Sequence, residues 1–144
     1  NLQPWRFIYA TSDKKEMFQR LFDCLVEFNQ NWVKTAPLLI LTVAKTIING
    51  RQQTHALHDV GLAIGNLSLQ ATAMDLYVHQ MGGFDVEKAR KEFNLPDGYE
   101  PVTMIAAGYI GESNILPDDL QKMEMAPRER MTQESFVFEG DFKR

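Results

Sequence analysis

The sequence lacks the features of a membrane span, a disulfide scaffold and a nucleic-acid surface. Its longest nearly unbroken apolar run, Ala36 to Ala44, is far shorter than the roughly 20 residues that a membrane helix needs. Cys24 is the single cysteine, so no internal disulfide can form, and we expect a cytoplasmic protein. Fifteen Lys and Arg residues stand against 19 Asp and Glu residues, which argues against nucleic-acid binding through a generally basic surface.

The sequence also lacks the short motifs of hydrolytic, zinc-dependent and phosphate-loop enzymes. No His-Glu-x-x-His, paired Cys-x-x-Cys, Gly-x-Ser-x-Gly or Gly-x-x-x-x-Gly-Lys pattern occurs. His55 and His58 stand beside Asp59, but two imidazoles without a third ligand fit solvated side chains better than a metal pair. Cys24 has apolar neighbours and is predicted to be a packed thiol rather than a catalytic one. We therefore predict neither a metal site nor catalytic side chains.

What is present is a chain of 144 residues, 44% of them apolar, with no repeat and no linker. This length and composition predict a single domain over residues 1–144. The chain begins at Asn1 without an initiator Met or a signal peptide, so we expect a fragment or a trimmed chain. Runs of β-branched, aromatic and other apolar residues predict four strands: Trp5–Ala10, Leu38–Val43 (apolar on both faces), Val102–Ile110 and Phe136–Phe138.

Helical spacing of apolar residues predicts the remaining elements. One helix is expected to start at a Ser12 or Asp13 cap with Glu16 completing a capping box, and to end between Asn29 and Lys34. A short helix capped by Asp85 is expected over Val86–Phe93, and one helical turn is expected after Pro117.

The strongest periodic signal runs from Leu57 to Val78, where apolar residues recur at steps of three and four and a second apolar stripe lies beside them. A helix apolar on more than one side is expected to be buried through the centre of the fold. Gly61 and Gly65, one turn apart, indicate another backbone packed closely against this helix. The predicted order is β-α-β-α-α-β-β, and the fold class is α+β, a sandwich of sheet and helices.

Three short segments are harder to explain by packing alone. Asn1 and Gln3 place two carboxamides, each with donor and acceptor, just before the first strand. Gly82-Gly83 offers backbone N–H groups that suit the close approach of a flat ligand or simply form a tight turn. Arg128 and Arg130, two apart after Pro127, form either a phosphate clamp or two solvated arginines.

Taken together, these segments resemble the flavin-dependent nitroreductase family. The resemblance covers essentially all 144 residues, and Asn1-x-Gln3-Pro-Trp is its most specific piece. The other pieces follow in the family's order: Asp59-Val-Gly-Leu-Ala-Ile-Gly-Asn-Leu, Met81-Gly-Gly-Phe-Asp, Ala107-Gly-Tyr-Ile-Gly and Pro127-Arg-x-Arg.

The resemblance implies a nitroreductase-like sandwich, with a mixed or antiparallel central sheet flanked by helices around the long buried helix. It also implies a homodimer with FMN in each interface cleft. Asn1 and Gln3 would lie against the isoalloxazine ring, and the Met81-Gly82-Gly83 turn would bring the Gly82 N–H to flavin N5.

The resemblance assigns two further parts of the chain. Asn29 would match a polar residue that reads the pyrimidine edge of the flavin. Arg128 and Arg130 would hold the FMN phosphate, and a swapped C-terminal arm would begin at Phe136.

Two departures from the family accompany these expectations. The family's N-terminal segment, which contributes to phosphate and ribityl binding, precedes the position of Asn1. Asp75 stands where many members have Gly, which leaves the substrate class open.

The implied activity is that of an FMN-dependent oxidoreductase. Hydride from NADH or NADPH would pass through flavin N5 to nitroaromatic, quinone or similar small-molecule acceptors in alternating half-reactions, with no catalytic side chain and no role for nucleic acid or membrane. The alternative is a non-catalytic or degenerate flavin-binding member of the same fold.

Overall fold

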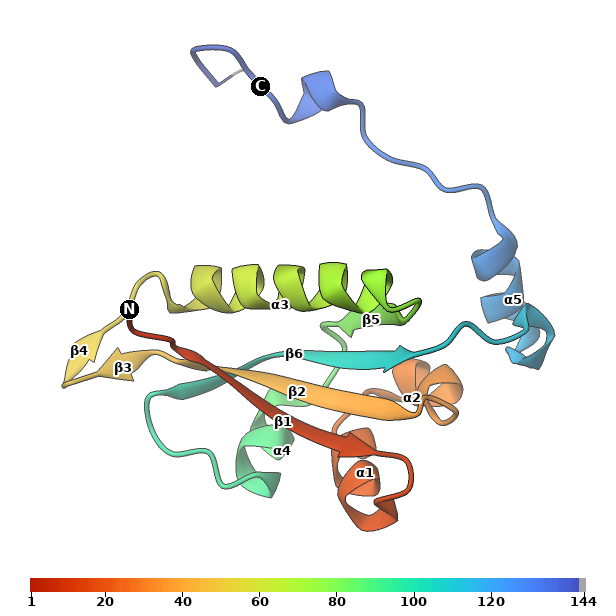
Figure 1. Cartoon of the computed structure of the whole chain (residues 1–144), viewed down its shortest axis with the longest axis horizontal. Coiled ribbons are helices and arrows are strands. Elements are labelled where there is room, and N and C mark those ends of the chain that lie inside the picture. Colours follow the sequence, from red (N-terminus) through yellow and green to blue (C-terminus); the bar gives the residue numbers. More distant parts are fainter. Residues whose placement is uncertain (143–144) are drawn as a thin grey trace. The chain divides into compact units, whose positions relative to one another are not determined.

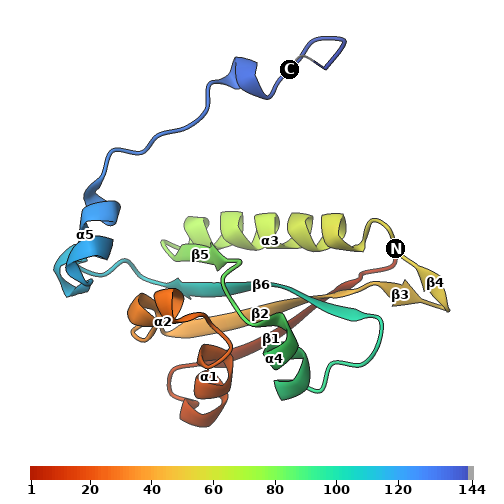
Figure 2. The same cartoon turned by 180° about the vertical axis from the view of Figure 1, so that it is seen from behind.

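The computed structural model describes residues 1–142, and the chain divides into two compact units. The first unit spans Asn1–Gly111 and holds the sheet, and the second begins at Glu112. The whole chain is traced in Figures 1 and 2, coloured along the sequence. In the described part of the chain, no helix is long and apolar enough to cross a membrane.

The first unit is built on a four-stranded sheet in which every neighbouring pair of strands is antiparallel. The order across the sheet is β1-β2-β6-β5, so β1 and β5 form its two edges. This confirms the predicted α+β class with an antiparallel sheet. The strands are β1 (Trp5–Thr11), β2 (Leu38–Lys45), β5 (Tyr77–Met81) and β6 (Tyr99–Gly108).

Helices cover both faces of the sheet. The helix α3 (Ala56–Ala73) lies across one face, as both views show (Figures 1 and 2). The other face carries three short helices: α1 (Lys15–Phe22), α2 (Glu27–Val33) and α4 (Val86–Glu92).

Strand β2 supplies side chains to both cores, because successive residues of a strand point to opposite faces. Leu39, Leu41 and Val43 belong to the cluster that includes residues of α1, α2 and α4. Ile40 and Ala44 belong to the cluster under α3. The prediction that this strand is apolar on both faces is confirmed.

The long helix ends earlier than predicted. Its last residue is Ala73, and Val78, expected to be helical, lies in edge strand β5. Asp75 stops the helix, because it adopts a left-handed φ of 59°. The Leu76 N–H then donates to the Ala71 carbonyl (2.9 Å), as in a Schellman motif.

Only one side of α3 is buried in the single chain. Val60 and Ile64 face the sheet, whereas Leu57, Leu62 and Leu69 are each more than half exposed. The predicted close backbone neighbour is also missing within the described chain, because a Cβ atom added at Gly61 or Gly65 would meet nothing within 4 Å. The expectation of a helix buried on all sides is therefore not met by one chain alone.

Other local predictions were wrong. The first predicted helix is two helices, α1 and α2, and neither Ser12 nor Asp13 caps the first one, whose N-cap is Lys14. The structure also contains a hairpin that the predicted order omits, β3 (Ile47–Ile48) paired with β4 (Arg51–Gln52). In contrast, Asp85 caps α4 as predicted, with its carboxylate accepting from the Lys88 N–H at 2.9 Å.

Over its described residues, 112–142, the second unit contains three short helical segments: η1 (Ser113–Ile115), α5 (Asp118–Met125) and η2 (Gln133–Ser135). Helix α5 begins directly after Pro117, where a helical turn was predicted. The strand predicted at Phe136–Phe138 is wrong, because a strand needs a partner and no described residue pairs with this segment. The expected swapped arm runs from Phe136 to the end of the chain, and its residues 143–144 lie outside the described residues.

Candidate functional site

The turn after strand β5 is held from both sides by hydrogen bonds. The Gly83 carbonyl accepts from the backbone N–H of Val26 (3.1 Å) and from the side-chain amide Nδ2 of Asn29 (2.9 Å). The Phe84 N–H donates to the Gly82 carbonyl at 3.1 Å. Both glycine carbonyls are therefore engaged within the protein.

The N–H groups of the same turn are available. Apart from bonds of the strand ladder, no described acceptor takes the N–H of Gly82 or Gly83. A Cβ atom built on Gly82 would meet nothing within 4 Å, so the space beside this residue is open. Neither glycine has a left-handed φ, so neither position needs an unusual backbone angle. This arrangement fits the close approach of a flat ligand with hydrogen-bond acceptors.

Gly83 and Gly82 differ in what surrounds them. A Cβ atom at Gly83 would lie 2.7 Å from Nδ2 of Asn29 and 3.0 Å from Cγ2 of Val26. Gly83 is thus packed against the start of α2, and Met81, the residue before Gly82, is buried in the core. The structure therefore brings together four of the predicted cofactor residues: Asn29, Met81, Gly82 and Gly83.

The carboxamides that precede the first strand lie elsewhere in the unit. Both Asn1 and Gln3 are exposed, and Gln3 has a left-handed φ of 45°. Their segment leads into β1, whereas Met81 closes β5 at the opposite edge of the sheet. Three strand spacings separate these edges, about 14 Å. Within one chain, Asn1 and Gln3 are therefore not brought to the Gly82-Gly83 turn.

The two predicted phosphate ligands belong to the second unit. Arg128 and Arg130 are exposed and lie in the irregular segment between α5 and η2. Arg130 donates from Nη1 to the neighbouring carbonyl of Glu129 (2.6 Å), and no carboxylate among the described residues is paired with either guanidinium. Two uncompensated cations on an extended segment retain their capacity to bind an anion.

The sequence also contains a cysteine and a histidine pair that lie outside the glycine turn. Cys24 is fully buried, its thiol contacts the Arg20 carbonyl at 3.3 Å, and burial raises the pKa of the thiol. His55 and His58 are exposed. Within residues 1–142, no group of three or more His, Cys, Asp or Glu side chains is arranged to hold a metal.

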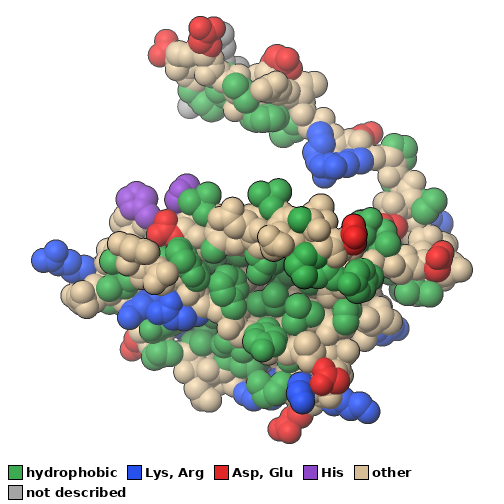
Figure 3. All heavy atoms as spheres, viewed as in Figure 1, with side chains coloured by type: hydrophobic (Ala, Val, Ile, Leu, Met, Phe, Trp, Pro, Cys, Tyr) green, Lys and Arg blue, Asp and Glu red, His purple; other side chains and the backbone are tan. Residues whose placement is uncertain are grey.

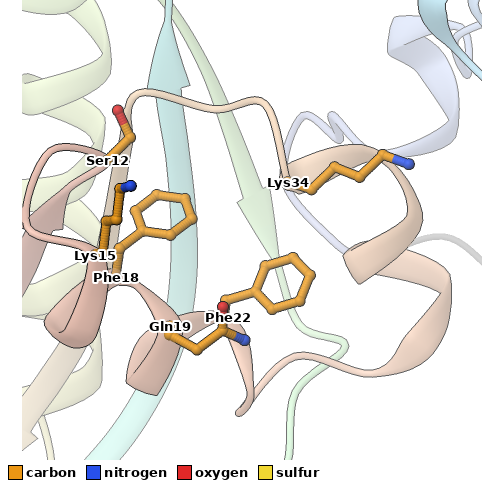
Figure 4. A pocket seen from close by; sticks show the side chains of 6 residues that line it. All are labelled: Ser12, Lys15, Phe18, Gln19, Phe22 and Lys34. Atoms are coloured by element: carbon orange, nitrogen blue, oxygen red, sulfur yellow. The ribbon is translucent and has the colours of Figure 1, made fainter.

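An open pocket of about 210 Å³ lies beside α1, and no residue of the glycine turn lines it. Figure 4 shows Phe18 and Phe22 on α1 facing this space, whereas Lys34 extends away from it. Its lining contains none of the predicted cofactor residues: Ser12, Lys15, Phe18, Gln19, Phe22 and Lys34. We therefore place the candidate site at the turn rather than in this pocket.

The sequence predictions did not include Val26, whose N–H helps to fix the turn. No local pattern marks this role, because Val26 and Gly83 are far apart in the chain and meet only when α2 packs against the end of β5. The adjoining bridge between Leu25 and Phe84 has the same long-range origin.

Comparison with known proteins identifies the family. The model of the nitroreductase family matches residues 1–109. This chain belongs to the nitroreductase family. Among curated proteins, the nitroreductase-family chain is 32% identical over 116 residues to an uncharacterised 15.4 kDa protein from Mycolicibacterium smegmatis, encoded in the 5′ region of ask. That alignment covers 81% of this chain and 78% of the relative.

Solved structures share the fold. A crystal structure described as an oxidoreductase containing FMN superposes with a TM-score of 0.92 at 31% identity, covering 99% of this nitroreductase-family chain and 73% of that chain. An FMN-dependent nitroreductase from Clostridium difficile R20291 gives a TM-score of 0.63 at 20% identity, covering 90% and 78%. The second likeness speaks to the fold alone.

Proposed function

We propose that this chain is a subunit of a homodimeric flavin oxidoreductase that binds FMN and transfers electrons from NAD(P)H to a nitroaromatic, quinone or similar small-molecule acceptor. The observation that carries the proposal is the Gly82-Gly83 turn, which is fixed through its carbonyls and open at its N–H groups. Membership of the nitroreductase family and the FMN-containing relative support the choice of cofactor.

Different residues of this chain would contact different parts of FMN. Gly82 would donate its N–H at the flavin ring, and the absence of a side chain there leaves room for the ring. Arg128 and Arg130 would hold the phosphate, and Asn1 and Gln3 would contact the isoalloxazine. When bound, FMN supplies the redox chemistry itself, so the protein contributes binding, orientation and electrostatics.

A second copy of the chain is supported by the bare side of α3. Leu62 and Leu69 are exposed there, and Gly61 and Gly65 leave open space beside the helix backbone. Figure 3 shows hydrophobic side chains gathered along and below this helix in the first unit. A contiguous apolar surface of this kind marks an interface, and small residues let a second backbone approach closely. A twofold interface would also let Asn1 and Gln3 of one subunit serve the turn of the other.

The test uses the whole purified protein with added FMN. The expected result is a yellow complex that survives gel filtration, bleaches anaerobically on addition of NADH or NADPH, and regains its colour when a quinone or nitroaromatic acceptor is added. A complex that binds FMN but is never bleached would instead support the non-catalytic flavin-binding alternative. Protein that does not retain FMN at all would contradict the proposal.

Replacing Arg128 and Arg130 by Ala tests the phosphate assignment. Charge-assisted hydrogen bonds contribute about 1.5–3 kcal/mol each, so either single replacement should weaken FMN binding by at least about tenfold. Because both side chains are exposed, the unfolding midpoint of the protein should not change. Unchanged FMN affinity in the double variant would reduce the pair to surface arginines.

A further inference from the structure

The side chain of Asn29 is almost fully buried, with 7% of its surface exposed. It lies on α2, and its Nδ2 group donates to the Gly83 carbonyl at 2.9 Å. The same Nδ2 atom would be 2.7 Å from a Cβ atom at Gly83, which shows how closely the amide packs against the turn. A primary amide of this kind is a donor that must find an acceptor once buried, and here the acceptor is the turn.

The bond from Asn29 completes the coordination of one carbonyl. The Gly83 oxygen receives both this Nδ2 donor and the backbone N–H of Val26, so both of its lone pairs are occupied. Two donors from the start of α2 therefore fix the direction of the Gly83 carbonyl. The Gly82 carbonyl is fixed in turn by the Phe84 N–H.

We infer that Asn29 is a positioning residue, which holds the Gly82-Gly83 turn so that its free N–H groups face the flavin, rather than itself reading the flavin's pyrimidine edge. The inference rests on the proposed function for its flavin part. Asn29 acts through Gly83, because its amide donates to that carbonyl and the residue is almost fully buried. Its helix therefore sets the geometry of a site whose ligand-facing atoms belong to another segment.

Gln30 offers a matched control on the same helix. Its Nε2 group also donates to backbone carbonyls, those of Phe22 (3.2 Å) and Leu25 (2.9 Å), but not to the turn. Asn29→Ala and Gln30→Ala thus each remove one amide that binds backbone carbonyls next to α2, and only the first releases Gly83. If Asn29→Ala does not fold, Asn29→Ser removes the same contact, since a hydroxyl on the shorter side chain can bond back to its own helix.

The first measurement is amide hydrogen exchange in the whole protein without FMN. Loss of one hydrogen bond should speed exchange of the Val26 and Phe84 amides by about two- to tenfold in Asn29→Ala. Gln30→Ala should leave the Phe84 amide unchanged. Unchanged exchange in Asn29→Ala would overturn the positioning role whether or not flavin binds.

The second measurement is made with FMN. Asn29→Ala should raise the FMN dissociation constant about two- to tenfold and shift the visible absorption bands of the bound flavin at saturation, whereas Gln30→Ala should change neither. Faster exchange with an unchanged flavin spectrum and affinity would overturn the inference while leaving the proposed function intact. Wild-type protein that binds no FMN would overturn the proposed function, and with it the flavin part of this inference.

Discussion

The helices on the two faces of the sheet differ in how completely their apolar side chains are buried. On one face, α1, α2 and α4 bury residues such as Leu21, Val33 and Ala89 completely. On the other face, α3 buries Val60 but leaves Leu62 and Leu69 more than half exposed on its outer side. The first face is complete within one chain, whereas the second presents an apolar surface that water covers poorly. The second face is therefore where the proposed homodimer would place the second copy.

The most sensitive test of this contrast is Leu62→Glu on the exposed side of α3. Burying one leucine is worth about 1.5–3 kcal/mol, and twofold symmetry counts it twice, so dimer affinity should fall at least about a hundredfold. Sedimentation velocity at micromolar concentration would measure the loss. Val86→Glu, at a partly exposed apolar position of α4 on the opposite face, is the control and should leave the dimer intact. If the two variants sediment alike, the exposed side of α3 does not form the dimer interface.

On the face covered by α1, α2 and α4, substitutions should instead change the free energy of unfolding. Leu21→Ala removes a fully buried side chain and should lower the free energy of unfolding by about 2–5 kcal/mol, measured by urea titration at fixed protein concentration. Met17→Ala on the same helix, where 36% of the side chain is exposed, should cost less than about 1 kcal/mol. Equal costs would mean that this face is less well packed than the structure indicates.

The two glycines of the turn show the same contrast between a position packed inside the chain and a position open to a ligand. Gly83→Ala places a Cβ atom against Asn29 and Val26 and should cost about 1–3 kcal/mol of stability. Gly82→Ala meets open space and should change stability by less than about 0.5 kcal/mol, while weakening FMN binding by crowding the ring. Thermal unfolding with and without FMN would separate the two effects. If Gly82→Ala lowers the stability and Gly83→Ala does not, the assignment of the two glycines is reversed.

The smallest expected effect lies where α3 ends and the chain turns toward edge strand β5. Asp75 occupies the left-handed C-terminal position of the helix, where Gly is favoured, so Asp75→Gly should raise stability by about 0.5–1 kcal/mol. Ala73→Gly, two residues earlier within the helix, should lower stability by about 1 kcal/mol. Chemical denaturation of both variants would check the opposite signs. In this structure Asp75 therefore serves to end the helix.

Signals that depend on neighbouring residues were sufficient for much of the fold. The Asp85 cap, the apolar β2 strand and the helix after Pro117 follow from local pattern, and all three are present. The β3–β4 hairpin also has a local signal, because Asn49-Gly50 is a preferred pair for a two-residue turn with left-handed φ angles. The predicted end of α3 is wrong because the helical spacing of apolar residues continues by chance into β5. Spacing alone does not show that a segment will pair with a strand.

The sequence by itself determined the α+β class, the buried β2 strand and the short segments that carry the family resemblance, since each depends on residue types and their spacing along the chain. Only the tertiary structure decided that α2 packs against Gly83 and that the Asn29 amide donates to the Gly83 carbonyl. It also decided that Asn1 and Gly82 lie toward opposite edges of the sheet. These facts arise from packing between residues distant in sequence. Hydrogen-bond direction and burial are properties of that packing, and no local pattern encodes them.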